Sequence, residues 1–507
     1  MADPHFDVVI IGSGAGGGTM ARALSGRDAS VLVLERGEWL PQEKENWDPA
    51  EVWRHRRYRT DERWVDRKGH SFVPFMNYTV GGNTKFWGAA LFRLRESDFG
   101  PVQYPDGTSP AWPIDYETLA PWYDRAEELY HVHGQKGADP TEPDRKPYPH
   151  LAVPHEPFIA QMVDRLTDLG VGAFPLPLGL INPAEPGGCL LCDTCNSFPC
   201  LLRAKSDADT CGMTPALESD NVALWTGARA ERLLTDASGR CVTGVQVNRR
   251  GERMRLTAGT VVLAAGAVNS AALLLDSPTH GHPGGLANSS GLVGRHYMAH
   301  ISTMMEAFYP FQINPTSFQK TVGIHDFYLP GHGRSYPLGA IQSQGRAHAA
   351  IVKAVMPGVP MWAADAWVRH GVDWLALTED LPDPENRVSL TTDGRISLSY
   401  RHNNLQVHRE LVREAVRMMR RLGSSGVVRH RFKNANTTHQ CGTLRFGEDP
   451  RTSVLDPYCR THDIENLFVT DSSFFPSSAA VNPGLTVIAQ TLRVADHLLA
   501  TDLERPA

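Results

Sequence analysis

Three polar side chains near the carboxyl end of the chain have types and positions suited to binding a small molecule. Asp471 follows a run typical of a buried strand, where its carboxylate can meet a ligand hydroxyl. Asn482 and Pro483 precede an apolar helix pattern, and the amino terminus of such a helix can face a partial negative charge. His439 lies well before Asn482 in the chain, so only the fold can bring the two side chains together.

A glycine-rich turn near the amino terminus indicates a dinucleotide site. Residues 8–11 form an apolar, β-branched run typical of a buried parallel strand. Gly12, Gly14 and Gly17 follow in G-x-G-x-x-G spacing, which permits a tight turn, close approach to a pyrophosphate and close helix packing. Glu35 ends the next apolar strand, where a carboxylate can bind an adenosine ribose. This pattern alone does not choose between FAD and NAD.

Two further turns have the composition of cofactor contacts. One places two glycines before small polar residues, which suits a backbone lying flat against a planar ligand, although an ordinary turn can look the same. The other joins a buried strand to a helix, as the opening turn does. Their members are Gly81, Gly82, Asn83 and Thr84 in the first turn and Ala265 and Gly266 in the second.

Cys189, Cys192, Cys195 and Cys200 form the most ambiguous motif in the chain. Their spacing resembles the start of a ferredoxin-type ligand run, but the last gap is one residue longer than in the usual bacterial pattern. Neither a histidine nor a separate second CxxC lies nearby to suggest a zinc site. We favour packed or redox-labile thiols and no metal, and an iron–sulfur cluster remains the alternative.

The length of the chain indicates how many domains to expect. At 507 residues the chain is too long for one ordinary core, so two domains are expected. Because it has neither internal repeats nor a low-complexity linker, we expect the domains to be interwoven.

Two local patterns predict secondary structure. Residues 119–132 are predicted to form a helix, and Asp393 and Gly394 are predicted to form a hairpin turn.

Charge and hydropathy exclude several classes of partner. A formal net charge of −6 argues against nucleic-acid binding. No apolar run approaches the roughly 18 residues that span a bilayer. The first residues lack the features of a signal peptide, so we expect a cytoplasmic protein without a membrane partner.

In these blocks the chain resembles the glucose–methanol–choline (GMC) oxidoreductases, FAD-dependent enzymes that act on alcohols. The resemblance covers both ends of the chain and several middle blocks, in order. The blocks are the opening glycine turn with Glu35, Gly81 to Thr84, the strand around Ala230, Ala265 with Gly266, residues 291–295, residues 386–388, His439 to Thr443, and Asp471 with Asn482 and Pro483.

The resemblance implies a mixed α/β fold with two interwoven domains. A Rossmann-like FAD-binding domain would comprise residues 1–100, 201–300 and 455–507. A substrate domain, built on a mostly antiparallel sheet with helices, would comprise residues 101–200 and 301–454. The chain matches the family least over residues 100–200 and 301–385, where members of the family build their substrate side.

The resemblance also implies roles for particular residues. His439 would take the hydroxyl proton of the substrate while a hydride leaves for flavin N5, and Asn482 would donate a hydrogen bond to the same oxygen. The helix after Pro483 would face the flavin, and Thr486 in its first turn could reach the ring edge. Further contacts are expected from Asp471 to the ribityl chain and from the backbone of Ala230 to the adenine.

The block after the double glycine bears on how the flavin is held. Some members of the family link the flavin through a histidine there, whereas this chain has Lys85, Phe86 and Trp87. FAD is therefore expected to bind non-covalently. Where this chain has Asn482, other members can have a second histidine.

The function expected is oxidation of a CH–OH group of a sugar, glycoside or polyol, with oxygen or another electron acceptor. One alternative is a dehydrogenase that passes electrons to a non-oxygen acceptor through a cysteine-bound cluster. A second is a flavin-containing lyase of the hydroxynitrile type, in which His439 would act as acid and base. A non-catalytic flavin-binding protein is hard to reconcile with the presence of both His439 and Asn482.

Overall fold

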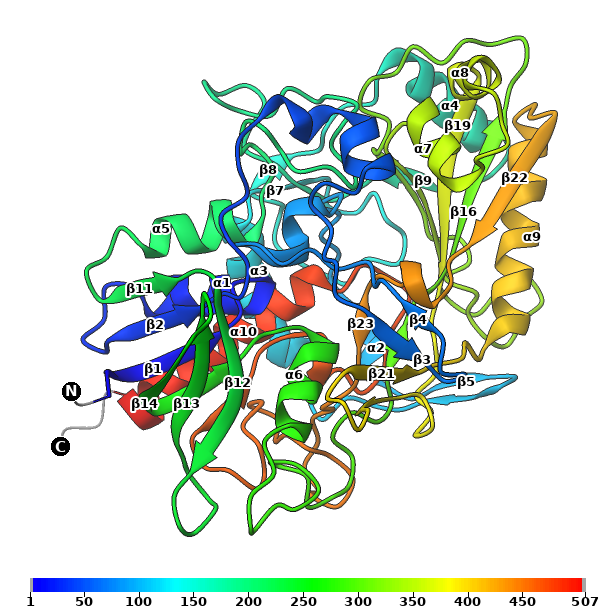
Figure 1. Ribbon diagram of the computed structural model, residues 1–507. Helices are drawn as coiled ribbons and strands as arrows, with labels where there is room; N and C mark the ends of the chain where they lie inside the picture. The colour runs from blue at the N-terminus through cyan, green and yellow to red at the C-terminus, as the bar shows by residue number, and fades with distance from the viewer. Residues whose placement is uncertain (1–2, 504–507) are drawn as a thin grey trace.

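The computed structural model describes residues 3–503. Its largest sheet carries the glycine-rich turn (Figure 1). This seven-stranded sheet has the order β11-β2-β1-β14-β13-β12, and β24 also pairs with β14. Strands β11, β2, β1, β14 and β24 run parallel, whereas β12 and β13 are antiparallel. The bounds are β1 (His5–Ile11), β2 (Val31–Leu34), β11 (Val222–Trp225), β12 (Ala228–Thr235), β13 (Val242–Arg249), β14 (Glu252–Leu263) and β24 (Leu467–Val469).

Apolar, β-branched residues build the parallel part of this sheet, because both of its faces are covered. All four residues of β2 and the last four of β1 are buried. Helix α1 (Ala15–Leu24) packs on β1 and β2 and also against α10 (Gly484–Leu498). The sequence-based prediction of a Rossmann-like unit is confirmed.

Helix α3 (Tyr116–Leu129) packs on α10 and corrects one predicted boundary. Residues 119–132 were expected to be helical, but the helix begins earlier, with the Asp115 carboxylate accepting from the backbone N–H of Thr118 at 2.9 Å. It also ends earlier, because His131 has a left-handed φ of 48° and Val132 already belongs to a strand.

The carboxyl ends of four neighbouring parallel strands bring distant parts of the chain to one edge of the sheet. Gly12 follows β1, Glu35 follows β2, Ala264 follows β14, and Asp471 comes soon after β24. This edge is where open α/β sheets bind their ligands. The fold thus gathers four predicted cofactor segments in one place.

A second, six-stranded antiparallel sheet forms the other half of the molecule (Figure 1). Its order is β22-β16-β19-β18-β17-β9. The strands are β9 (Ala173–Pro175), β16 (Ile301–Phe308), β17 (Val322–Ile324), β18 (Ala340–Ser343), β19 (Gly371–Thr378) and β22 (Gly426–Arg431). Their position confirms the mostly antiparallel sheet expected on the substrate side.

The two faces of this sheet differ in character because side chains alternate along each strand. Met305 and Trp374 belong to an apolar cluster that also contains Leu411 of α9 (Leu405–Arg421). The residues next to them, Glu306 and Asp373, point to the opposite face. One face therefore packs on a helix, and the other is free to form a cavity wall.

A four-stranded sheet joins segments that we had expected to lie in different domains. The strands β3 (Trp64–Asp66) and β4 (Ser71–Phe72) pair through β3 with β21 (Ile396–Ser399) and β20 (Arg387–Leu390). The hairpin predicted at Asp393 and Gly394 connects β20 to β21 and is confirmed.

The remaining β-strands and α-helices are short. The strands are β5 (Val102–Tyr104), β6 (Gly107–Ser109), β7 (Val132–Gly134), β8 (His150–Leu151), β10 (Leu178–Gly179), β15 (Met298–Ala299) and β23 (Gln440–Cys441). The helices are α2 (Glu96–Phe99), α4 (Pro157–Asp168), α5 (Thr214–Ala216), α6 (Ala267–Leu275), α7 (Ala349–Val355) and α8 (Met361–Arg369). Across residues 3–503, no helix has both the length and the hydropathy needed to cross a bilayer.

Candidate active site

A cavity of about 730 Å³ is lined by both large sheets and contains most of the predicted site residues in its wall. Its size is within the range of ligand sites in proteins. The predicted residues in this wall are Gly12, Gly14, Glu35, Gly82, Asn83, Thr84, Ala230, Ala265, Gly266, His439, Asp471, Asn482 and Pro483. Gly17, Gly81 and Thr486 lie outside it.

The three glycines of the opening turn are required for three different reasons. Gly12 has a φ of +102°, and a Cβ there would lie 2.4 Å from the carbonyl oxygen of Ala264. A Cβ on Gly17 would lie 1.8 Å from the carbonyl oxygen of Gly12, so this glycine permits the helix to pack on the turn. At Gly14 a Cβ would meet no atom within 4 Å, because this position faces the open cavity.

Glu35 is buried at the end of β2 and retains one free acceptor position. Its Oε2 accepts from the backbone N–H of Ser13 at 3.2 Å and from the Ser13 hydroxyl at 2.6 Å. Its Oε1 accepts from the backbone N–H of Gly37 at 2.8 Å. A carboxylate offers about four acceptor positions, so one position on Oε1 remains for a ligand hydroxyl. Burial raises the pKa of Glu35.

The double-glycine turn lies directly on the glycine-rich turn. The backbone N–H of Gly81 donates to the Ser13 hydroxyl at 3.1 Å, and a Cβ on Gly82 would lie 3.4 Å from Cα of Gly14. The Thr84 hydroxyl donates to the carbonyl of Gly81 at 2.6 Å. Gly81 therefore lies outside the cavity and contacts the residues that line it, whereas Gly82, Asn83 and Thr84 line the cavity themselves.

Asp471 has all its acceptor positions filled by the protein. Its Oδ2 accepts from the Gly266 N–H at 2.8 Å and from the Ser270 hydroxyl. Its Oδ1 accepts from the Ser473 N–H at 2.9 Å and from the Ser473 hydroxyl. With about four acceptor positions in use, this carboxylate ties the turn at Gly266 to the segment after β24. Asp471 also lines the cavity, and its contact with the ribityl chain stays a prediction.

His439 and Asn482, which lie far apart in the chain, meet in the cavity wall. His439 directly precedes β23 and has a left-handed φ of 57°. The side-chain amide of Asn482 donates through Nδ2 to Nε2 of His439 at 3.4 Å. Gln342 of β18 donates to Oδ1 of Asn482 at 3.3 Å, which fixes the orientation of the amide.

A second histidine, His300, determines the tautomer of His439. Nε2 of His300 lies 2.9 Å from the carbonyl oxygen of Ser478 and must donate to it. Burial lowers the pKa of His300 to about 4, so its ring is neutral and its Nδ1 can only accept. Nδ1 of His439 lies 2.9 Å from that atom and therefore carries the proton. Nε2 of His439 is therefore unprotonated and is the atom that accepts from Asn482.

Charge and burial keep His439 neutral. Its surroundings lower the pKa of His439 well below the usual value, chiefly through desolvation, with smaller contributions from His300 and Lys320. Lys320 lines the same cavity and donates to Oδ1 of Asn196 at 3.3 Å. Burial lowers the pKa of Lys320 to about 8, so it remains cationic near neutral pH.

Helix α10 begins at Gly484, directly after Asn482 and Pro483, and its amino terminus faces the cavity. No acidic side chain occupies its first turn, so its partial positive charge is directed at the cavity. Thr486 is buried and its hydroxyl is hydrogen-bonded to the Tyr123 hydroxyl at 2.8 Å. The Thr486 hydroxyl thus contacts α3 outside the cavity lining, and its contact with the flavin ring stays a prediction.

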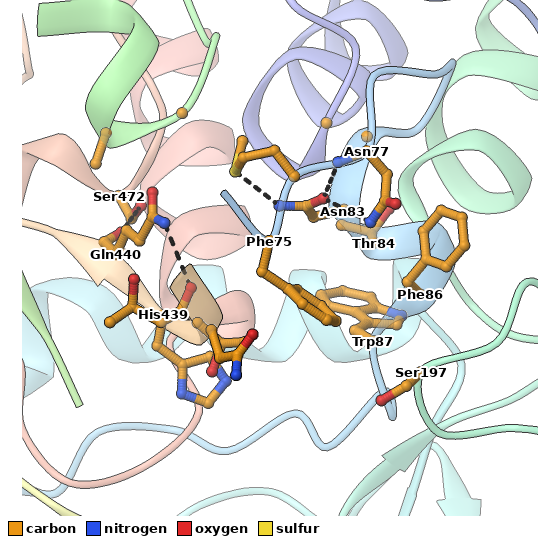
Figure 2. Close-up of a pocket in the computed structure, with 18 of the residues that line it drawn as sticks. Phe75, Asn77, Asn83, Thr84, Phe86, Trp87, Ser197, His439, Gln440 and Ser472 are labelled. Atoms are coloured by element: carbon orange, nitrogen blue, oxygen red, sulfur yellow. Dashed lines mark hydrogen bonds between the residues drawn. The ribbon is translucent and has the colours of Figure 1, made fainter. Parts of the chain in front are cut away.

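Aromatic side chains form the wall on one side of His439. Figure 2 shows Phe75, Phe86 and Trp87 projecting from the segment around the double-glycine turn. Lys85, in contrast, points away into ion pairs with Asp207 at 3.1 Å and Asp209 at 2.9 Å.

The four clustered cysteines lie beside the cavity as partly buried free thiols. Burial raises the pKa of Cys189 to about 12 and also raises that of Cys195. Within residues 3–503, no three His, Cys, Asp or Glu side chains are arranged to hold a metal ion.

The sequence analysis missed three residues that the structure brings to the site: His300, Lys320 and Gln342. None lies in a motif with a recognisable spacing. His300 precedes β16, Lys320 precedes β17 and Gln342 lies within β18, so each depends on the second sheet for its position.

Comparisons with known proteins agree with this architecture. Family models described as GMC oxidoreductase match residues 178–302 and 382–491. The chain is 31% identical to a 6'''-hydroxyparomomycin C oxidase of Streptomyces lividus, covering 98% of this chain and 93% of that protein. It is also 31% identical to a paromamine 6'-oxidase of Streptomyces fradiae, over 97% and 91% of the two chains.

More distant similarities include a dehydrogenase and a solved oxidase. The chain is 28% identical to a fructose dehydrogenase large subunit of Gluconobacter japonicus, covering 97% of each protein. Among solved structures, pyridoxine 4-oxidase from Mesorbium loti superposes with a TM-score of 0.68 at 21% identity, covering 97% of this chain and 99% of that one. This last similarity concerns the fold alone.

Proposed function

The chain belongs to the GMC oxidoreductase family, and from this premise we propose that it oxidises a CH–OH group of a sugar, glycoside or polyol to a carbonyl, with His439 as the base. The proposal rests on a series of hydrogen bonds that runs from Ser478 through His300 and His439 to Asn482. It leaves one unprotonated nitrogen facing the cavity beside an amide donor.

FAD is the cofactor of this family, and the cavity fits it. Gly14 leaves open space at the turn where a pyrophosphate approaches the backbone, and Glu35 keeps one acceptor position at the end of β2. The amino terminus of α10 supplies partial positive charge at the opposite end of the predicted site. When bound, FAD accepts the hydride that leaves the substrate carbon. Because residues 85–87 include no histidine, we propose that FAD binds non-covalently.

The protein side of the reaction is a proton transfer to His439. Nε2 of the neutral imidazole takes the proton of the substrate hydroxyl, and His300 holds the other ring nitrogen in place. Nδ2 of Asn482, already directed at the same point, donates a hydrogen bond to the oxygen as its negative charge develops. The Lys320 ammonium adds positive charge to this region.

The substrate class rests on the relatives. Two are named as oxidases of paromamine and of a hydroxyparomomycin, and a third as a fructose dehydrogenase. These names support a sugar or glycoside, with either oxygen or another acceptor taking the electrons. The division of the chain into an FAD domain and a substrate domain at the predicted boundaries is part of the same proposal. The strands of the two large sheets fall on either side of that division.

Anaerobic flavin reduction tests the proposal. Purified holoenzyme is mixed under nitrogen with a panel of sugars, glycosides and polyols, and the flavin absorbance is followed. At least one compound is expected to bleach the flavin, and His439→Ala should retain bound FAD but slow the bleaching by about 10²–10⁴-fold. Bleaching of the His439→Ala flavin at the wild-type rate would remove His439 from the role of base.

The same experiment separates the alternatives. Rapid recolouring on admission of air identifies an oxidase, and slow recolouring that a quinone accelerates identifies a dehydrogenase. A flavin that no alcohol bleaches, in a protein that cleaves a cyanohydrin, would establish the lyase and overturn the oxidation proposal.

A further inference from the structure

A pair of acidic side chains lies on the cavity face of the second sheet. Glu306 of β16 and Asp373 of β19 are direct cross-strand partners in the antiparallel ladder. Such partners have Cβ atoms about 4.5–5.5 Å apart, and like charges in this position destabilise a sheet. Both side chains line the cavity, and both residues are largely buried, with 9% and 6% of their surface exposed.

The pair has little compensation from the protein. Oε1 of Glu306 is buried and has no hydrogen-bond partner among residues 3–503. Asp373 accepts from the backbone N–H of Ala347 at 2.8 Å, and the side chain of Gln319 also favours its charged form. Among the described residues, no lysine or arginine forms an ion pair with either carboxylate. A buried, unpaired acid is costly, so a pair of them calls for an occupant.

The pair lies on the same wall as the proposed catalytic residues. Asp373 is two residues from Leu375 on β19, a separation of about 7 Å along a strand. Leu375 is the cross-strand partner of Gln342, whose side chain contacts Asn482. A substrate whose hydroxyl lies at Asn482 would therefore extend toward Glu306 and Asp373 along the sheet.

We propose that Glu306 and Asp373 form a subsite for a protonated amine of the substrate, so that this enzyme acts on an amine-bearing sugar or cyclitol. The inference rests on the proposed function, since it concerns the far end of the molecule whose CH–OH group is oxidised. A single ammonium group placed between the carboxylates would relieve their mutual repulsion and supply the missing hydrogen bonds.

Other occupants fit the pair less well. A neutral hydroxyl would supply hydrogen bonds but no charge, so it would not stabilise the pair in its ionised form. In the described part of the chain the pair has no third carboxylate, histidine or cysteine to complete a metal site. Arg346 bears on Asp373 electrostatically, but its Nη1 donates to the carbonyl of Thr316 at 3.4 Å and does not bridge the acids.

Paired probes test the subsite on the holoenzyme. Glucosamine is compared with N-acetylglucosamine, and paromamine with its fully N-acetylated form, by calorimetric titration and by the rate of flavin reduction at pH 7. For at least one pair the free amine should bind about 10–100-fold more tightly than the acetylated form, as expected for hydrogen bonds to charged groups. Glu306→Gln and Asp373→Asn should each reduce that ratio mainly through KM, with a smaller change in kcat.

Asp365→Asn is the matched control, because Asp365 lies on α8, outside the cavity wall, and loses the same charge. It should keep the wild-type preference. Equal affinity for amine and acetylated forms in both pairs, or an amine preference that survives in Glu306→Gln and Asp373→Asn, would overturn the subsite. Failure of the proposed function looks different, because then neither neutral nor amine-bearing alcohols reduce the flavin.

Discussion

Nδ1 of His300 lies 2.9 Å from Nδ1 of His439, and it is a proton acceptor because its other ring nitrogen donates to the carbonyl of Ser478. This contact holds His439 in the one neutral tautomer that leaves Nε2 unprotonated toward the cavity. A buried histidine with no substrate contact thereby selects the reactive form of the proposed base.

Replacing His300 should therefore slow the chemical step while leaving substrate binding intact. In His300→Leu the imidazole of His439 loses its acceptor, and we expect flavin reduction to slow by about 10–100-fold, the scale typical of lost orienting contacts. KM and FAD content should change little. Stopped-flow reduction at saturating substrate measures the effect.

Two further variants make that measurement specific. His300→Gln keeps an acceptor atom on the side chain and should recover part of the rate. His282→Leu removes a partly buried histidine that contacts the carbonyl of Gly239, away from the cavity, and should behave as wild type. A wild-type rate in His300→Leu would show that the contact does not orient the base.

The glycine-rich turn predicts opposite phenotypes for two alanine variants. Gly14→Ala adds a methyl group in open space, so the apoprotein should fold normally but bind FAD about 10–100-fold more weakly, the result of about 1–3 kcal/mol of steric conflict with the cofactor. Gly17→Ala places a Cβ 1.8 Å from the carbonyl oxygen of Gly12 and should lower the thermal midpoint of the apoprotein itself. Titration of the apoprotein with FAD and thermal unfolding of the apoprotein distinguish the two variants. Equal unfolding midpoints for Gly14→Ala and Gly17→Ala would contradict the different roles given to these glycines.

Lys320 should set the alkaline limit of activity. Burial lowers the pKa of Lys320 to about 8, so its charge near His439 is present at neutral pH and lost as the pH rises through 8. The pKa of His439 is lowered well below 6.5, so the base stays unprotonated down to acidic pH. We therefore expect kcat/KM to stay level from acidic pH up to about pH 8 and to fall above it. Lys320→Met should lower the plateau and remove the alkaline decline, whereas a decline that persists in this variant would assign it to another group.

The acid pair should make the unliganded protein less stable as the pH rises. Burial and the neighbouring Asp373 raise the pKa of Glu306 to about 8, and burial raises that of Asp373 to about 7. The native state therefore binds more protons than the unfolded state between about pH 4.5 and 8, and stability falls as the pH rises through that window. Glu306→Gln should gain about 1–3 kcal/mol over wild type at pH 8 and little at pH 4.5. Urea unfolding at the two pH values measures the difference; a Glu306→Gln variant that is less stable than wild type at pH 8 would mark Glu306 as a structural support.

Local motifs in the sequence were sufficient to predict the cofactor half of the molecule. Gly12 and Gly17 are required by close backbone contacts within a few residues or with a neighbouring strand, and such constraints leave a fixed spacing. The same holds for the hairpin at Asp393 and Gly394, where the turn chemistry is local. The end of α3 was predicted wrongly because a single left-handed residue, His131, stops a helix that the hydrophobic pattern would have continued.

What the sequence determined by itself is the set of groups that must be present: a dinucleotide turn, a histidine block and an asparagine ahead of a helix. The tertiary structure alone decided how these groups are held and what surrounds them. Lys320, Glu306 and Asp373 line the cavity, and His300 and Gln342 contact its wall residues His439 and Asn482. All five lie in or next to strands of the second sheet, so their positions depend on how those strands pair. Because strand partners are set by contacts across the sheet, their spacing in the chain carries no signature. The residues proposed to orient the base and to bind the substrate therefore became visible only in three dimensions.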